Sequence, residues 1–260
     1  MIKAVTFNLG CGGPHTQPRI DAAFAWVAAA RDQYDLVFAQ EIPGDEWLAL
    51  WEETHDVYAF AAPKYRVRSA ILVRRTALES RSCHFVSEKY HDSYVAACQV
   101  RHAEEWLTCM SVHASPSEVA DKWLVEWPDQ LARPTPRAGL GLWDSDMLLT
   151  SVAAVSSRGP ALIAGDWNEA RDWDLTHDDG SGAAFFDRVH DLGLIDCTWS
   201  QWNQTERATC LPERGVSLQV DRIFATKQTA VAMSDCVVEP LPMPEFDHMP
   251  IAFLLETKNP

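Results

Sequence analysis

The stretch from residue 69 to residue 112 decides the fold, because it holds three strand-like segments and no helical one. They read SAILVRR (residues 69–75), SYVAACQV (93–100) and WLTCMSV (106–112), each short, rich in apolar residues and followed by polar residues. Strands that follow one another with no helix between them exclude a strict βαβ alternation. They favour mixed sheets packed face to face, with helices outside.

The rest of the chain supplies further strands and the helices expected to cover them. We predict strands at 2–7, 35–40, 161–166, 218–225 and 250–256, and helices at 19–31, 117–127, 145–156 and 183–192. No internal repeat is evident, and the Pro-rich segment 128–136 is best interpreted as a surface loop between two helices. We therefore predict one α/β domain over residues 1–260, built on two packed mixed sheets with outer helices.

The composition narrows the class of protein and its partners. The chain has 260 residues, 47% of them apolar and 23% charged, which excludes wholesale disorder. Lys and Arg number 22 against 37 Asp and Glu, giving a formal charge of -15. A protein that neutralises duplex DNA over a broad surface should be basic on at least one face, so a small or single-stranded substrate fits this chain better.

The N-terminal segment and the cysteines favour a cytoplasmic protein. Residues 1–13 have neither the longer apolar core nor the cleavage site of a secretory signal, and no apolar run is long enough to span a bilayer. Seven cysteines are scattered along the chain without CxxC spacing. We interpret them as reduced thiols instead of a disulfide or zinc framework, and we expect no membrane partner.

Polar side chains gather beside one end of five of the predicted strands. They are Asn8, Glu41, His113, Asp166 with Asn168, and Asp247 with His248. Each one alone also fits a turn or a structural histidine. Strands lying side by side would bring these groups to one rim, where several carboxylates repel one another unless a cation neutralises them. An oxygen-rich cluster of this kind suits Mg²⁺ or Mn²⁺ better than Zn²⁺.

Taken in order, these motifs resemble the endonuclease/exonuclease/phosphatase superfamily, the metal-dependent phosphoesterases related to pancreatic-type deoxyribonuclease. The matching pieces are TFNLG (with Asn8), AQEI (Glu41), SVHASPSE (His113), AGDWN (Asp166 and Asn168), QVDRIF (Asp221) and FDHMPI (Asp247 and His248). They run nearly the whole chain in the family's order. Trp167 stands where Phe is usual, and Phe246 replaces a common Ser. The resemblance implies a four-layer α/β/β/α sandwich with the site at one edge.

The resemblance also implies a role for each residue. Glu41, Asn8 and Asp247 would hold Mg²⁺, with Mn²⁺ as an alternative. Asp166 would deprotonate the attacking water and Asn168 would donate to the phosphoryl oxygens. The remaining catalytic groups are His248, supported by Asp221, and His113 on the other side of the phosphate. The glutamate that supports the histidine equivalent to His113 in the deoxyribonuclease branch is missing from KYRVRS (64–69), so the partner of His113 stays open.

One basic segment stands out in this acidic chain. Arg66 and Arg68 alternate with apolar residues before a predicted strand, and Arg74 follows within it. They fit either a charged strand edge that resists aggregation or a surface that contacts substrate phosphates. We take Arg66, Arg68 and Arg74 as candidate substrate-binding residues. Eleven tryptophans fit core packing, or a platform on which single-stranded bases stack.

These features favour a magnesium-dependent phosphodiesterase that acts on a nucleic acid or nucleotide, single-stranded in preference to duplex. The first alternative is a phosphatase or phosphodiesterase of a small molecule, lipid or inositol phosphate, suggested by the charge and by Arg222 beside Asp221. The second is a catalytically dead binding or scaffold protein, although such relics usually lose some of the acids and histidines found here. Substrate identity, the mode of cleavage, the number of ions and the oligomeric state are left open.

Overall fold

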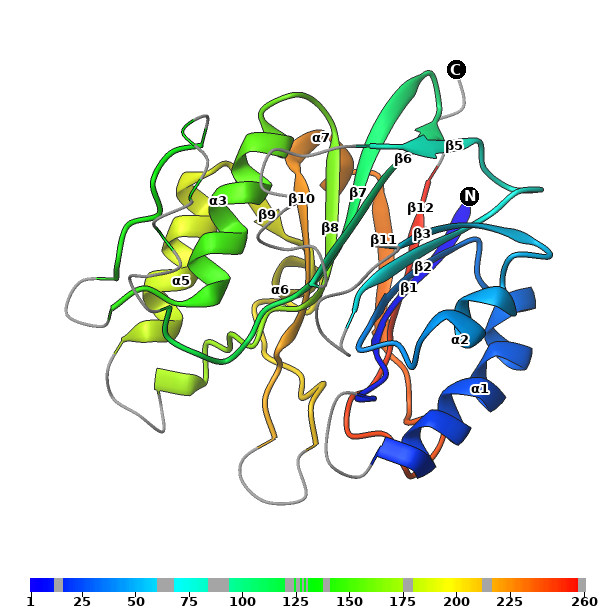
Figure 1. The fold of residues 1–260 in the computed structure, drawn as a ribbon. Coiled ribbons are helices and arrows are strands. Elements are labelled where there is room, and N and C mark those ends of the chain that lie inside the picture. Colours follow the sequence, from blue (N-terminus) through cyan, green and yellow to red (C-terminus); the bar gives the residue numbers. More distant parts are fainter. Residues whose placement is uncertain are drawn as a thin grey trace.

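Two six-stranded mixed sheets form the centre of the molecule (Figure 1). The computed structural model describes residues 1–11, 16–59, 68–83, 94–119, 124, 127, 129, 131–137, 141–174, 180–211 and 217–256. The first sheet has the order β11-β12-β1-β2-β4-β3 and the second the order β5-β6-β7-β8-β10-β9. The predicted fold class, two packed mixed sheets with helices around them, is confirmed.

The strands of the first sheet are β1 (Ile2–Asn8), β2 (Leu36–Gln40), β3 (His55–Ala59), β4 (Ala70–Arg74), β11 (Met233–Val238) and β12 (Ile251–Leu255). Those of the second are β5 (Ser80–Ser82), β6 (Val95–His102), β7 (Glu105–His113), β8 (Ala161–Asp166), β9 (Leu194–Asp196) and β10 (Asp221–Thr226). The helices are α1 (Thr16–Gln33), α2 (Asp45–Ala49), α3 (Asp144–Ser156), α5 (Ser181–Asp191), α6 (Cys197–Gln201) and α7 (Lys227–Ala230).

Because side chains alternate between the two faces of each strand, the apolar ones pack in three layers, one between the sheets and one under the helices on each side. In β1, Ala4 packs between the sheets, whereas Val5 and Phe7 belong to the core under α1. A third core lies between β7, β8 and the helices α3 and α5, around Trp167. Figure 1 shows α1 and α2 on one side of the paired sheets, and α3 and α5 on the other. The sheets are therefore covered on both outer faces, as the four-layer expectation requires.

The register brings the ends of the central strands together. Asn8 pairs with Gln40 in the parallel pair β1/β2, and His113 pairs with Asp166 in the parallel pair β7/β8. Between the sheets, Gln40 donates a 2.8 Å hydrogen bond to the hydroxyl of Ser111. Such a buried polar link between facing sheets is satisfied only in one alignment, so it fixes how the two strand ends face each other.

Most predicted elements are present, with bounds shifted by a few residues. The helix predicted at 117–127 falls largely outside the described residues, and Glu118 within it forms an isolated bridge to Trp143. The strands β3, β5, β9 and β11 and the short helices α2, α6 and α7 were not predicted. Among the described residues, no helix is both long and apolar enough to cross a membrane. The prediction of a single domain stays a prediction.

Gly165 is the residue that lets β8 approach β7 just before Asp166. Its φ is +148°, and a Cβ added to it would lie 2.0 Å from the carbonyl oxygen of Val112. Backbone strain and overpacking each cost about 1–3 kcal/mol, so Gly165→Ala should lower the free energy of unfolding by roughly 2–6 kcal/mol. Urea unfolding measures the loss. Gly159→Ala is the matched control, because Gly159 has φ +150° but open space around its Cβ position. Equal losses in the two variants would contradict the steric explanation.

Candidate active site

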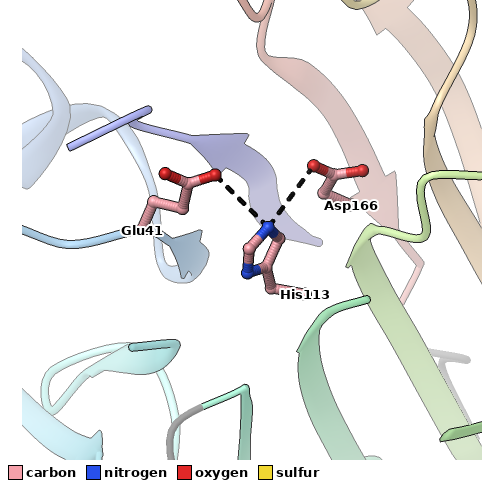
Figure 2. A group of neighbouring side chains, drawn as sticks. All are labelled: Glu41, His113 and Asp166. Atoms are coloured by element: carbon pink, nitrogen blue, oxygen red, sulfur yellow. Dashed lines mark ion pairs between the residues drawn. The ribbon is translucent and has the colours of Figure 1, made fainter. Parts of the chain in front are cut away.

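Glu41, His113 and Asp166 meet at the rim where the two sheets face each other (Figure 2). The His113 ring presents Nε2 to both acids, 3.2 Å from Glu41 Oε1 and 3.9 Å from Asp166 Oδ2. Burial by itself would lower the pKa of His113. The hydrogen bond with Glu41 and the charges of Asp166 and Glu41 outweigh burial, and they raise the pKa above its ordinary value. The two carboxylates therefore favour the charged form of His113.

Asn8 joins the two acids from the first sheet. Its Nδ2 donates to Glu41 Oε1 at 3.2 Å and to Asp166 Oδ2 at 2.9 Å, while its Oδ1 accepts from the backbone N–H of Gly10 at 2.9 Å. Asn8 therefore orients the carboxylates of Glu41 and Asp166, and its role as a metal ligand stays a prediction.

Asp166 is the most heavily bonded acid of the site. Its carboxylate accepts from the backbone N–H of Asn168 at 2.9 Å and from the Asn168 amide at 3.2 Å. Burial and the neighbouring charge of Asp221 raise the pKa of Asp166 to about 6. A carboxylate with a pKa near the working pH can both take up and release a proton, as a general base must.

Asn168 sits in the left-handed region, with φ 50°, directly after the strand. This turn aims its amide back toward Asp166 and also lets it donate to the carbonyl oxygen of Ala114 at 2.7 Å. Both N–H groups are engaged, so a contact with a phosphoryl oxygen requires one of these bonds to be exchanged.

His248 and Asp221 form a second pair on the other side of Asp166. His248 Nδ1 lies 2.9 Å from Asp221 Oδ2, and both side chains are buried. Burial would lower the pKa of His248, but the charge and the hydrogen bond of Asp221 raise it well above its ordinary value. Asp221 therefore orients the ring and favours its charged form.

The predicted ligand Asp247 is held elsewhere. Its Oδ2 forms a 2.8 Å ion pair with Arg19 Nη2, at the start of α1. Among the described residues, two groups of three side chains place ligand atoms within 4.8 Å of one another. These are Glu41 with His113 and Asp166, and Asp166 with Asp221 and His248. Asp247 belongs to neither group.

The three arginines predicted to bind substrate differ in their placement. Arg66 lies outside the described residues. Arg68 is buried and its guanidinium pairs with Asp45 at 2.7 Å. Arg74 lies at the end of β4 opposite the site, because Ala70 and not Arg74 pairs with Ala39. Its guanidinium donates to the carbonyl oxygens of Arg31 and Tyr34. The structure therefore does not bring Arg74 to the site.

Arg222, which suggested the inositol-phosphate alternative, is paired with acids of this chain. Its side chain is fully buried, and its Nη2 donates to both oxygens of Glu206 at 2.7 Å. Since Arg222 neighbours Asp221 along β10, it points to the opposite face of the strand. Arg222 thus holds the segment around Glu206 and is not available to a substrate.

The comparison of the whole sequence with protein families shows to which family the chain belongs. The model of the Endonuclease/Exonuclease/phosphatase family matches residues 5–251, which include every site residue described above. The chain belongs to this family. It is accordingly a metal-dependent phosphoric ester hydrolase, and the predicted resemblance is confirmed. None of the curated proteins matches the sequence.

Solved structures agree with the family on the fold. The endonuclease domain of the telomere-specific retrotransposon TRAS1 is 18% identical, covers 100% of both chains and has a TM-score of 0.66. The 3′ phosphatase NExo from Neisseria, bound to product DNA hairpin, is 18% identical over 98% of this chain and 100% of its own, with a TM-score of 0.70. An AP endonuclease from Archaeoglobus fulgidus is 18% identical over 98% and 99%, with a TM-score of 0.66.

The residues of this family member fit a divalent cation. Glu41 and Asp166 direct carboxylate oxygens toward the same point, together with His113 Nε2. In the second group a buried carboxylate oxygen, Asp221 Oδ1, has no hydrogen-bond partner. Buried carboxylates without partners are stabilised by a cation or its bound water. The crowding of acids predicted from the sequence is therefore present, and it needs positive charge.

Arg19 was not predicted as a site residue, and the partner of His113 was left open. Arg19 lies on α1 soon after the TFNLG motif, but it belongs to no motif, and its contact with Asp247 forms only in the folded chain. His113 Nδ1 is buried without a hydrogen-bond partner, and the acids that hold this ring act on Nε2. The AQEI motif already contained one of them, Glu41, but their contact could not be read from spacing.

Proposed function

We propose that this chain is a magnesium-dependent phosphodiesterase that hydrolyses phosphodiester bonds of a nucleic acid or nucleotide. The observation that carries the proposal is the position of Asp166, which belongs to both groups of potential ligands. It lies between Glu41 on one side and the Asp221–His248 pair on the other. One carboxylate can thus face a water molecule while a cation and an acid lie on either side of the same phosphorus atom.

Asp166 is proposed to accept the proton of the attacking water. Its raised pKa, about 6, makes the carboxylate a stronger base than an exposed aspartate while it is still largely ionised at neutral pH. The N–H groups of Asn168 and Asn8 keep it oriented. Glu41 would hold Mg²⁺, which when bound polarises a phosphoryl oxygen and offsets the charge of the nucleophile and the leaving group.

The two histidines are proposed to act on opposite sides of the phosphate. His248, protonated through its bond to Asp221, would stabilise the charge that develops on the phosphoryl oxygens or protonate the leaving alkoxide. His113 would do so from the Glu41 side. Asn168 would add a neutral donor once one of its present bonds is exchanged.

The choice of a nucleic acid over a small phosphate is supported by the family and by the described activities of solved relatives, one of them bound to a DNA hairpin. The formal charge of -15 favours single-stranded over duplex substrates. A cytoplasmic location remains part of the proposal, supported by the seven free cysteines.

A panel of substrates tests the proposal. Single-stranded DNA, RNA, duplex DNA, inositol phosphates and sphingomyelin would be incubated with the chain and Mg²⁺, Mn²⁺ or EDTA. We expect cleavage of single-stranded nucleic acid with Mg²⁺ and loss of turnover with EDTA, restored by excess Mg²⁺, because the carboxylates alone repel an anionic phosphate. Turnover of inositol phosphates or sphingomyelin without any cleavage of nucleic acid would contradict the proposed substrate. Cleavage that persists in EDTA would contradict the proposed chemistry.

A further inference from the structure

Arg19 connects two loops that carry site residues. From the first turns of α1 its Nη1 donates to the carbonyl oxygen of Gly10 at 3.2 Å, and its Nε donates to that of Glu245 at 3.1 Å. Its Nη2 pairs with Asp247 at 2.8 Å. One guanidinium thus joins the loop after β1 to the loop before β12, with a different nitrogen used for each contact.

These contacts leave Asp247 little freedom to turn toward another cation. Its second oxygen, Oδ1, is buried, has no hydrogen-bond partner and lies 2.9 Å from the position that a Cβ on Gly10 would take. Gly10 is itself fixed, since its N–H donates to Asn8. The carboxylate is therefore packed against backbone on one side and paired with Arg19 on the other.

A chain of hydrogen bonds links Arg19 to Glu41. Arg19 donates to the carbonyl oxygen of Gly10, the N–H of Gly10 donates to Asn8 Oδ1, and Asn8 Nδ2 donates to Glu41 Oε1. The backbone N–H of the next residue, Cys11, donates to the carbonyl oxygen of Glu41 at 3.2 Å. A positive charge beside this loop opposes the binding of a cation at Glu41, unless an acid neutralises it.

We propose that Arg19 is a positioning residue that withholds Asp247 from the metal ion, so that the ion is held on the Glu41 and Asp166 side and Arg19 lowers the affinity for it. The inference rests on the proposed function, because it requires a divalent cation at Glu41. It assigns Asp247 to neutralising Arg19 instead of binding metal. The ion pair then acts as a neutral unit beside the site.

The test is the affinity for Mn²⁺, measured by calorimetric titration of the full chain without substrate. Arg19→Gln should tighten binding about tenfold, because it frees a carboxylate and removes a positive charge. Asp247→Asn should weaken binding about tenfold, because it leaves Arg19 without its counter-charge. The double variant should return to within about threefold of the unmodified chain, because it removes a neutral pair. Arg31→Gln is the matched control: it lies on the same helix, and its ion pair with Glu53 is exposed.

Different results would contradict the role of Arg19 and the proposed function. If Asp247 bound the metal with Arg19 orienting it, the double variant would bind as weakly as Asp247→Asn, and Arg19→Gln would not bind more tightly. Either result overturns the inference while the proposed function stands. If the unmodified chain bound no Mn²⁺ at all, the proposed function would fail as well. Arg19→Lys keeps the charge and should bind like the unmodified chain, which covers the case in which Arg19→Gln does not fold.

Discussion

Asp166→Asn should reduce turnover by a factor of about 10³ or more while the chain stays folded. The amide cannot accept the proton of the attacking water, and it replaces an acceptor with a donor where Asn8 and Asn168 both donate. The measurement is kcat on the best substrate of the panel under saturating Mg²⁺. Asp172→Asn provides the matched control, since Asp172 is an exposed acid in the loop that follows the same strand.

The stability of Asp166→Asn checks the physical origin of the effect. Because the folded protein raises the pKa of Asp166 to about 6, ionisation of this carboxyl favours the unfolded chain as pH rises from about 4 to about 6. The Asn variant avoids this loss of stability. We therefore expect the difference in melting temperature between the variant and the unmodified chain to move in favour of the variant as pH rises from about 4 to about 8. A difference that does not change with pH, or turnover within tenfold of normal, would contradict the assigned role.

Much of the site could be predicted from the sequence because its residues stand at strand ends. The predicted strands that end near Asn8, Gln40, His113 and Asp166 have buried apolar residues before these groups, so the pattern locates both the strand and its rim. Parallel pairing then brings Asn8 beside Gln40 and His113 beside Asp166. The chemistry of the rim follows from residue types alone, since crowded acids and imidazoles need a cation or protons.

The unpredicted elements have physical reasons. The strands β5 and β9 contain three residues each, too few for an alternation to be recognised. In β11 the register shifts between Ser234 and Val237, and Asp235 has φ 52°, so the apolar period is broken by a bulge. A basic run such as the one ending at Arg74 looks like a phosphate-binding surface until the pairing places its end far from the rim. Contacts such as that of Arg19 with Asp247 join residues more than 200 positions apart, and no local pattern encodes them.

Asp221→Asn should lower turnover by about 10²-fold and move the alkaline limb of the pH–rate profile to lower pH. The Asp221 carboxylate favours the protonated form of His248, because its charge and its hydrogen bond outweigh the effect of burial on the pKa. Without that charge the ring loses its proton at lower pH, although the hydrogen bond with Cys210 and the charge of Asp166 still raise its pKa. The pH dependence of kcat and an NMR titration of the His248 ring measure the shift. Asp187→Asn, an exposed acid on α5, is the matched control.

The Asp221–His248 pair should also make the stability of the fold depend on pH, in a direction set by the raised pKa of His248. The folded protein raises the pKa of His248, so the ion pair stabilises the fold fully below about pH 6.5, the pKa of a free histidine, and this contribution is lost as pH rises through the raised value. The melting temperature of Asp221→Asn should therefore fall below that of the unmodified chain by more at pH 6 than at pH 10. An alkaline limb that stays in place in Asp221→Asn, together with a stability difference independent of pH, would mean that His248 owes its charge to another group.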